Sequence, residues 1–142
     1  MAEKEFRNPK YYTNRELSWL LFNHRILGEA RDKSIPLFER LKFLSITASN
    51  LDEFFMVRVA SLKDMVNAGY EKPDIAGMTP TEQLKALHEA IHKFVELQYS
   101  TYNRSLLPQL EQNGLHIIKH HELLTEEEGA YLDKYFADNV YP

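Results

Sequence analysis

The sequence of 142 residues contains no cysteine, so disulfide bonds, thiolate metal sites and cysteine nucleophiles are excluded within it. It also lacks an apolar run long enough to span a bilayer. Its first residues, Met1 to Lys10, are polar and mixed in charge, unlike a secretory signal peptide. Together these absences predict a cytoplasmic protein without a transmembrane segment.

Glycine is scarce, and the five glycines are scattered along the chain. Neither of the phosphate-binding patterns G-x-x-x-x-G-K-S/T and G-x-G-x-x-G occurs, and no G-x-S-x-G nucleophile elbow is present. The usual backbone site for a triphosphate is therefore absent. The formal net charge of −4 also excludes the broad basic surface that is typical of duplex nucleic-acid binding.

Apolar residues make up 44% of the chain, which is enough to fill a core. Thr13 and Glu16 have the spacing of a capping box, which predicts that a first helix starts there and runs to Ala30. Its apolar side chains cover more than one narrow stripe: Leu17, Trp19, Leu20, Leu21, Phe22, Ile26 and Leu27. We therefore expect this helix to be buried on several sides, at the centre of a bundle or against another domain.

A second helical segment is predicted from Pro36 to Ala68. Its apolar positions recur in steps of four and three residues, as a bundle helix requires: Leu37, Leu41, Leu44, Ala48, Leu51, Phe55, Leu62 and Met65. Ser49 and Asn50 are poor residues for a helix interior, because their side chains compete for nearby backbone groups. The segment is either one long helix or two, and we favour a kink or short break near Asn50.

Arg58 occupies a slot in the apolar face of this segment. It is expected either to form a buried ion pair with Glu53 or Asp52, or to bind phosphate with its planar guanidinium. Asp52 and Glu53 are adjacent and point about 100° apart on a helix, so they cannot act as a facing acid–base pair. Asn50 can either cap a helix or read the edge of a purine, because an amide both donates and accepts.

A third helix is predicted after a loop. Gly69 is expected to end the second segment, and Thr79, Pro80 and Glu82 form a start signal. Helical spacing continues to Leu106, with a kink or restart at Pro108 and a stop at Asn113-Gly114. After this stop, Leu115 to Lys119 reads as a short strand. A capping box of Thr125 and Glu128 then predicts a final helix.

The histidines offer no convincing metal site. His88 and His92 have the spacing of two ligands on one helix face, but no pattern supplies a third ligand. His120 and His121 are expected in a solvated loop, and His24 as a hydrogen-bonded histidine inside the first helix. We predict no catalytic and no metal-binding residue in this chain.

Three linked segments resemble signatures of bacterial polyphosphate kinases. They are RELSWL followed by FN-x-RIL at residues 15–27, PL-x-ERLKFL at 36–44, and SNLDEFFMVRV at 49–59. The match is strong from Tyr12 to Leu62 and looser to Pro142. The resemblance implies a mainly α fold: a small up-down bundle of three to four helices, similar to a spectrin repeat, over residues 1–112. Residues 113–142 are then the truncated strand-helix beginning of the family's α/β head domain.

The resemblance also implies a function. The family reversibly transfers the terminal phosphate of ATP to inorganic polyphosphate through a phosphohistidine, and its helical domain forms one wall of the ATP site. The asparagine of its Asn-Leu-Asp-Glu-Phe motif contacts the nucleotide base, and this position is Asn50 here. The phosphohistidine and the ligands of Mg2+ lie in later domains, so this chain alone should be inactive. ATP, ADP, polyphosphate and the remaining domains are the implied partners, in a homo-oligomer.

Two other functions stay open. The bundle can serve mainly for packing between domains or for oligomer contacts, with Asn50 as a helix cap, or it can be a separate helical adaptor. The implied parent enzyme is cytoplasmic, with peripheral membrane association a further option.

Overall fold

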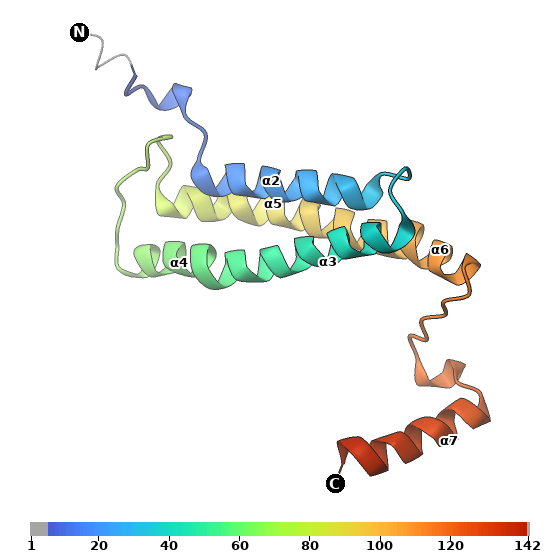
Figure 1. Cartoon of the computed structure of the whole chain (residues 1–142). Helices are drawn as coiled ribbons and strands as arrows, with labels where there is room; N and C mark the ends of the chain where they lie inside the picture. The colour runs from blue at the N-terminus through green and yellow to red at the C-terminus, as the bar shows by residue number, and fades with distance from the viewer. Residues whose placement is uncertain (1–5, 142) are drawn as a thin grey trace. The chain divides into compact units, whose positions relative to one another are not determined.

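The computed structural model describes residues 6–141, and every regular element within this range is helical (Figure 1). The chain forms two compact units, residues 1–108 and 109–142. The α-helices are α2 (Arg15–Arg31), α3 (Leu37–Phe54), α4 (Ala60–Asn67), α5 (Pro80–Thr101), α6 (Leu107–Gln112) and α7 (Glu126–Tyr135). Wider π-helical turns occupy Phe55–Val59, Tyr102–Leu106 and Phe136–Val140, and short 3-10 turns occupy Pro9–Tyr11 and His121–Leu123.

The first unit is an up-down bundle. Helix α2 runs in one direction, the joined helices α3 and α4 return, and α5 runs parallel to α2 (Figure 1). Helix α2 packs on both α3 and α5, and α4 packs on α5. The helical-bundle part of the predicted fold is therefore confirmed.

The core of this bundle combines apolar and polar side chains. Its buried apolar cluster consists of Leu20, Leu27, Ala30, Leu44, Leu51, Phe54, Val59, Leu62, Leu87, Ile91, Phe94 and Leu106. Burying one large apolar side chain contributes about 1.5–3 kcal/mol relative to its exposure. Arg40 is 1% exposed in the same core. Its Nε donates to the carbonyl oxygen of Ala30 at 3.0 Å, and its Nη2 donates to Oγ of Ser105 at 2.9 Å.

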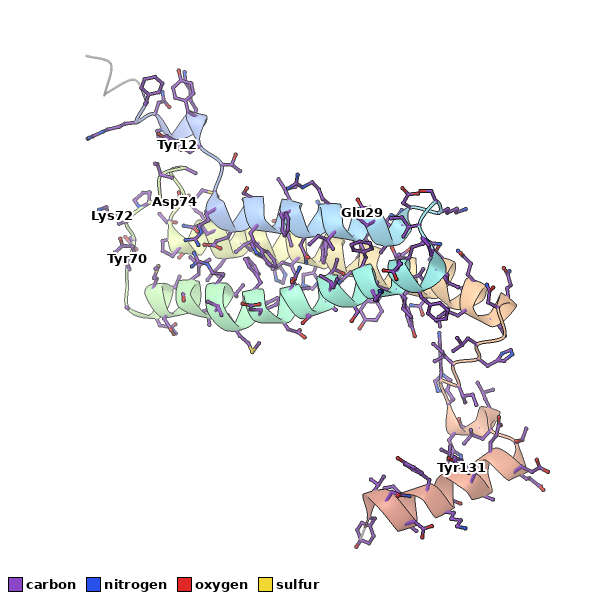
Figure 2. The ribbon with its side chains drawn as sticks, viewed as in Figure 1. Tyr12, Glu29, Tyr70, Lys72, Asp74 and Tyr131 are labelled. Carbon is purple, nitrogen blue, oxygen red and sulfur yellow. The ribbon has the colours of Figure 1, made fainter. Side chains whose placement is uncertain are left out.

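The start of α2 differs from the sequence prediction. Asn14 is the N-cap, and its Oδ1 accepts hydrogen bonds from the backbone N–H groups of Glu16 and Leu17. Its Nδ2 donates to Oδ2 of Asp74 at 2.8 Å, which holds the loop before α5 against this helix end (Figure 2). The predicted capping box of Thr13 and Glu16 is wrong, because asparagine caps a helix as well as threonine and the Glu16 carboxylate is engaged elsewhere.

The second helical segment has no break at Asn50. Helix α3 continues through Ser49 and Asn50 to Phe54, and the irregular turn comes later, at Phe55–Val59. The predicted kink near Asn50 is wrong, because the Asn50 amide bonds to α2 rather than to its own backbone. The segment ends as predicted at Gly69, whose φ of 69° suits glycine.

The third helix begins and ends as its sequence signals predict. Thr79 and Glu82 form a capping box at the start of α5, and Gly114 lies at the end of α6 with a φ of 80°. A π-helical turn separates α5 from α6 just before Pro108. Proline lacks an N–H donor and its ring crowds the preceding turn, so the restart near Pro108 is confirmed.

The second unit corrects the predicted α/β piece. Residues Leu115 to Lys119 form no strand, and no strand occurs anywhere in residues 6–141. A β-branched run needs a partner to satisfy its backbone hydrogen bonds, and the described residues supply none. The capping box of Thr125 and Glu128 is confirmed at the start of α7. The division into domains at 1–112 and 113–142 stays a prediction.

Candidate functional site

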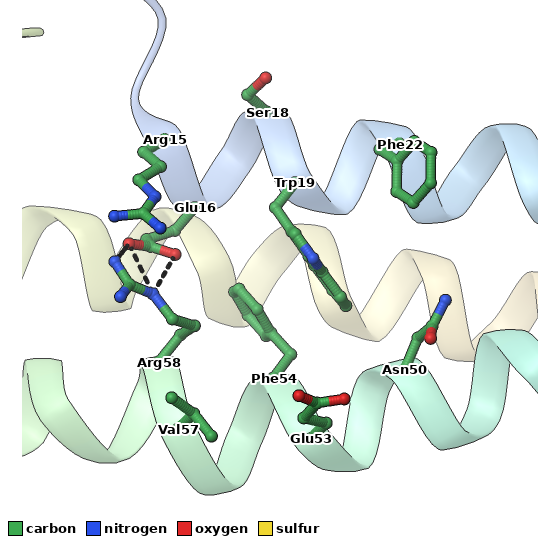
Figure 3. Close-up of a pocket in the computed structure, with 10 residues that line it drawn as sticks. All are labelled: Arg15, Glu16, Ser18, Trp19, Phe22, Asn50, Glu53, Phe54, Val57 and Arg58. Atoms are coloured by element: carbon green, nitrogen blue, oxygen red, sulfur yellow. Dashed lines mark hydrogen bonds and ion pairs between the residues drawn. The ribbon is translucent and has the colours of Figure 1, made fainter.

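A pocket of about 480 Å³ lies between α2 and α3 and extends to the turn at Phe55–Val59 (Figure 3). Helix α2 contributes one side and α3 the other. The lining residues are Arg15, Glu16, Ser18, Trp19, Phe22, Asn50, Glu53, Phe54, Val57 and Arg58. Two of the three signature segments therefore supply its walls, since residues 15–22 and 50–58 meet here.

Two stacked aromatic rings form the apolar wall of the pocket. Trp19 projects from α2 and Phe54 from α3, with ring centroids 4.4 Å apart and planes inclined by 8°. Phe54 is buried in the core, whereas Trp19 is partly exposed. Such a pair stabilises the helix contact by about 0.5–1.5 kcal/mol beyond the area that it buries. Phe54 supports the Trp19 ring from behind, and the partly exposed Trp19 ring gives the pocket a flat surface that suits a planar ring.

A charged pair closes one end of the pocket. Nε of Arg58 donates to both carboxylate oxygens of Glu16, at 3.0 and 3.1 Å, and Nη2 donates to Oε1 (Figure 3). The Glu16 side chain is 7% exposed and the Arg58 side chain 36%. The hydrogen bonds to Glu16 raise the pKa of Arg58, so the guanidinium stays charged.

The ion pair predicted for Arg58 was assigned to the wrong carboxylate. Asp52 and Glu53 lie exposed on the same helical segment as Arg58. Glu16 instead projects from the opposite helix and is buried, so its bidentate pair with Arg58 joins α2 to the turn after α3.

Asn50 lies beside the aromatic wall and belongs to a buried polar network. Its Nδ2 donates to Oδ1 of Asn23 at 3.0 Å, and Nδ2 of Asn23 donates to the carbonyl oxygen of Thr47 at 3.1 Å. The Thr47 hydroxyl donates to the carbonyl oxygen of Leu44 and accepts from Nε2 of Gln98. Asn23 and Thr47 are 0% exposed. The network therefore connects α2, α3 and α5 behind the pocket.

The lining residues form a site with three chemical surfaces. A planar ring can lie against the aromatic wall, the Asn50 amide can hydrogen-bond to the edge of that ring, and Arg15 is exposed at the charged end. Sequence reasoning identified Asn50 but missed Trp19, Phe54 and Glu16. The local signal for the α2 side of the pocket was the pair Trp19 and Phe22, which both line it and lie three residues apart on one side of the helix.

The histidines lie away from this pocket. His88 and His92 contact each other with ring centroids 4.4 Å apart, yet residues 6–141 contain no group of three or more histidine, aspartate or glutamate side chains placed to hold a metal ion. His24 meets the edge of Phe94 at 4.7 Å. Burial lowers the pKa of His24, so its neutral form is favoured.

No helix formed by residues 6–141 is both long enough and apolar enough to cross a bilayer. The fold and the pocket together define a helical-bundle domain with a partly aromatic pocket between two helices. The family model of the polyphosphate kinase N-terminal domain matches residues 12–118. The chain belongs to this family, and the resemblance inferred from its three segments is confirmed.

Individual relatives agree with this family. The chain is 55% identical over 137 residues to a polyphosphate kinase of Lactiplantibacillus plantarum, and the match covers 96% of this chain and 19% of that protein. It is 50% identical over 133 residues to a polyphosphate kinase of Bacillus anthracis, which covers 93% of this chain and 19% of the relative. The chain thus spans about a fifth of the length of these curated relatives.

A solved structure has a similar fold. The crystal structure of polyphosphate kinase from Porphyromonas gingivalis matches with a TM-score of 0.70 and 34% sequence identity. The match covers 90% of this chain and 17% of that one. The bundle is therefore a fold that occurs within a polyphosphate kinase.

Proposed function

We propose that this chain acts as the amino-terminal domain of a polyphosphate kinase and that the pocket between α2 and α3 forms one wall of its ATP site. The parent enzyme transfers the terminal phosphate of ATP to inorganic polyphosphate, and the reverse reaction returns ATP from ADP. In this proposal Asn50 binds the nucleotide base, as the family resemblance implies.

The observation that carries the proposal is the position of Asn50 beside a flat aromatic wall. Trp19 and Phe54 provide an apolar surface, and Asn50 provides a donor and an acceptor at its edge. A volume of about 480 Å³ lies within the usual range for small-ligand sites. Purine bases are commonly bound by stacking on aromatic rings together with hydrogen bonds between an amide and the edge of the base.

The chemistry of the transfer is assigned to the rest of the enzyme. Phosphoryl transfer depends on positioned cations and donors around the moving phosphate. The described residues offer Arg15 and Arg58 near the pocket, but Arg58 is paired with Glu16. We therefore assign the phosphohistidine and the ligands of Mg2+ to other domains, and we expect this chain alone to be inactive. Homo-oligomer formation and a cytoplasmic location stay predictions.

The test uses the full-length enzyme that contains this domain. Asn50→Ala should raise the KM for ATP about fivefold to tenfold, the size expected for one lost hydrogen bond in a pocket. It should also lower the thermal stability, because the buried Oδ1 of Asn23 loses its donor, so the KM is the measurement that decides. Polyphosphate synthesis is measured against ATP concentration. Asn67→Ala is the matched control, since Asn67 is exposed on α4 and outside the pocket. An unchanged KM in Asn50→Ala would contradict the proposal.

A second candidate function is packing between domains. Phe55, Met56 and Val57 follow one another on the turn after α3, with exposures of 44%, 72% and 51%. Exposed apolar patches of this kind often mark contact surfaces. If packing is the main role, Met56→Ser should weaken the assembly of the full-length enzyme, while Asn50→Ala should lower stability and leave the KM for ATP unchanged.

A further inference from the structure

The Asn50 amide is held from one side only. Its Nδ2 donates to Oδ1 of Asn23 at 3.0 Å, and Figure 3 shows this nitrogen on the side of α2. Within residues 6–141, Oδ1 of Asn50 accepts no hydrogen bond. Asn50 is partly buried and lines the pocket, so its oxygen and its second N–H are the groups left for a ligand.

The orientation of the Asn23 amide is fixed by a backbone group. Nδ2 of Asn23 donates to the carbonyl oxygen of Thr47 at 3.1 Å, and a carbonyl oxygen can only accept. The nitrogen of Asn23 must therefore face Thr47, which leaves Oδ1 facing Asn50. Because Oδ1 can only accept, Asn50 must present its nitrogen to Asn23. A 180° flip of either amide would bring two acceptors or two donors together.

We propose that Asn23 is a positioning residue that orients the Asn50 amide for the recognition of adenine. This inference rests on the proposed ATP site. With its nitrogen held by Asn23, Asn50 presents an oxygen that accepts from the exocyclic amine of adenine and an N–H that donates to a neighbouring ring nitrogen. Guanine carries an oxygen in place of that amine, and the fixed oxygen of Asn50 repels it. Asn23 itself is buried and stays out of contact with the ligand.

The test replaces Asn23 by leucine, which has a similar size and no hydrogen-bonding group, in the full-length enzyme. The freed Asn50 amide can then rotate. The KM for ATP should rise about threefold to tenfold, with kcat nearly unchanged. The preference for ATP over GTP should fall by a similar factor, because an amide that can rotate can hydrogen-bond to either base. A purely structural role of Asn23 would leave this nucleotide preference as it is.

Thr47→Val is the matched control. It removes the buried hydroxyl that accepts from Nε2 of Gln98 at 2.9 Å, so it disturbs the same network. It keeps the backbone carbonyl that orients Asn23. Thr47→Val should therefore lower the melting temperature without changing the KM for ATP or the nucleotide preference. If Asn23→Leu fails to fold, Asn23→Ala replaces it, with the same expected kinetic effect.

The outcomes separate this inference from the proposed function. A raised KM in Asn50→Ala, with wild-type KM and nucleotide preference in both Asn23 variants, would overturn the positioning role and leave the ATP site standing. Equal kinetic effects of Thr47→Val and Asn23→Leu would also overturn it, because general loosening of the core would explain both. No effect of Asn50→Ala would remove the ATP site and this inference together. Support requires that Asn23→Leu add nothing to Asn50→Ala in the double variant.

Discussion

The two units of this chain contain the same helix start in different surroundings. Thr79 and Glu82 begin α5, and Thr125 and Glu128 begin α7. The two capping boxes have the same geometry. In each, the threonine N donates to Oε2 of the glutamate at 2.8 Å, and the threonine hydroxyl donates to the same oxygen at 2.9 Å. The glutamate N donates to the threonine Oγ1 at 3.3 Å. Helix α5 buries seven residues, whereas α7 buries none.

This difference separates the local hydrogen bonds that start a helix from the tertiary packing that buries its apolar face. A capping box satisfies free N–H groups within four residues, so its geometry does not depend on the rest of the fold. The hydrogen bonds from each threonine lower the pKa of Glu82 and of Glu128 alike. Burial of an apolar face supplies most of the stability of a helix in a protein. Of the two helices compared, α5 has such a face buried within its own unit and α7 does not.

The largest contrast is expected from aromatic residues of the two helices. Phe94 of α5 is 0% exposed and Tyr131 of α7 is 66% exposed. Figure 2 labels Tyr131 on its helix. Phe94→Ala should lower the free energy of unfolding by about 3–5 kcal/mol, because it leaves a cavity in the core. Tyr131→Ala should change it by less than about 0.5 kcal/mol. Urea unfolding of the 142-residue chain, followed by circular dichroism, measures both. Similar losses would show that α7 is packed as firmly as α5.

Substitution of the two capping threonines should give a smaller contrast. Thr79→Ala should lower the free energy of unfolding of the first unit by about 1 kcal/mol, as is usual for a lost N-cap. Thr125→Ala should leave that transition unchanged and only speed amide hydrogen exchange in the first turn of α7. Hydrogen exchange read by mass spectrometry, together with urea unfolding, tests this pair. A shift of the main transition by Thr125→Ala would mean that the two units unfold together.

The smallest effect is expected from pH in the first unit. Burial lowers the pKa of His24 from its ordinary value of 6.5. As the pH falls below about 6.5, the unfolded chain takes up a proton before the folded chain does, so stability decreases until the folded pKa is passed. Above that range His24 has no effect. The His24→Gln variant should lose less stability than the parent between pH 7.5 and pH 5.5 in urea unfolding. Parallel losses in the two proteins would exclude His24 as the cause.

Local signals in the sequence predicted much of the fold. The capping boxes at Thr79 and Thr125 and the glycines at Gly69 and Gly114 lie where their backbone chemistry requires them. One prediction that needed a partner from a distant part of the chain was wrong. The strand at Leu115 to Lys119 has no strand to pair with among the described residues.

The candidate site shows the same limit. Asn50 was proposed as a site residue through the resemblance. Because asparagine is unfavourable inside a helix, however, the sequence also predicted a helix break there, which the structure does not contain. Its partner Asn23 lies 27 residues away, and only tertiary packing brings them together. Glu16 was expected to cap its own helix, yet it pairs with Arg58 across 42 residues. No local pattern distinguishes these uses of the same side chain.

The buried amide pair has a consequence for how the bundle can move. Helices in contact can shift past each other by one turn, about 5.4 Å. Such a shift of α2 along α3 would separate Asn23 from both Asn50 and the Thr47 carbonyl, and it would leave polar groups unpaired in the core. The register of the two helices is therefore fixed, and the pocket walls are expected to move together as one rigid piece.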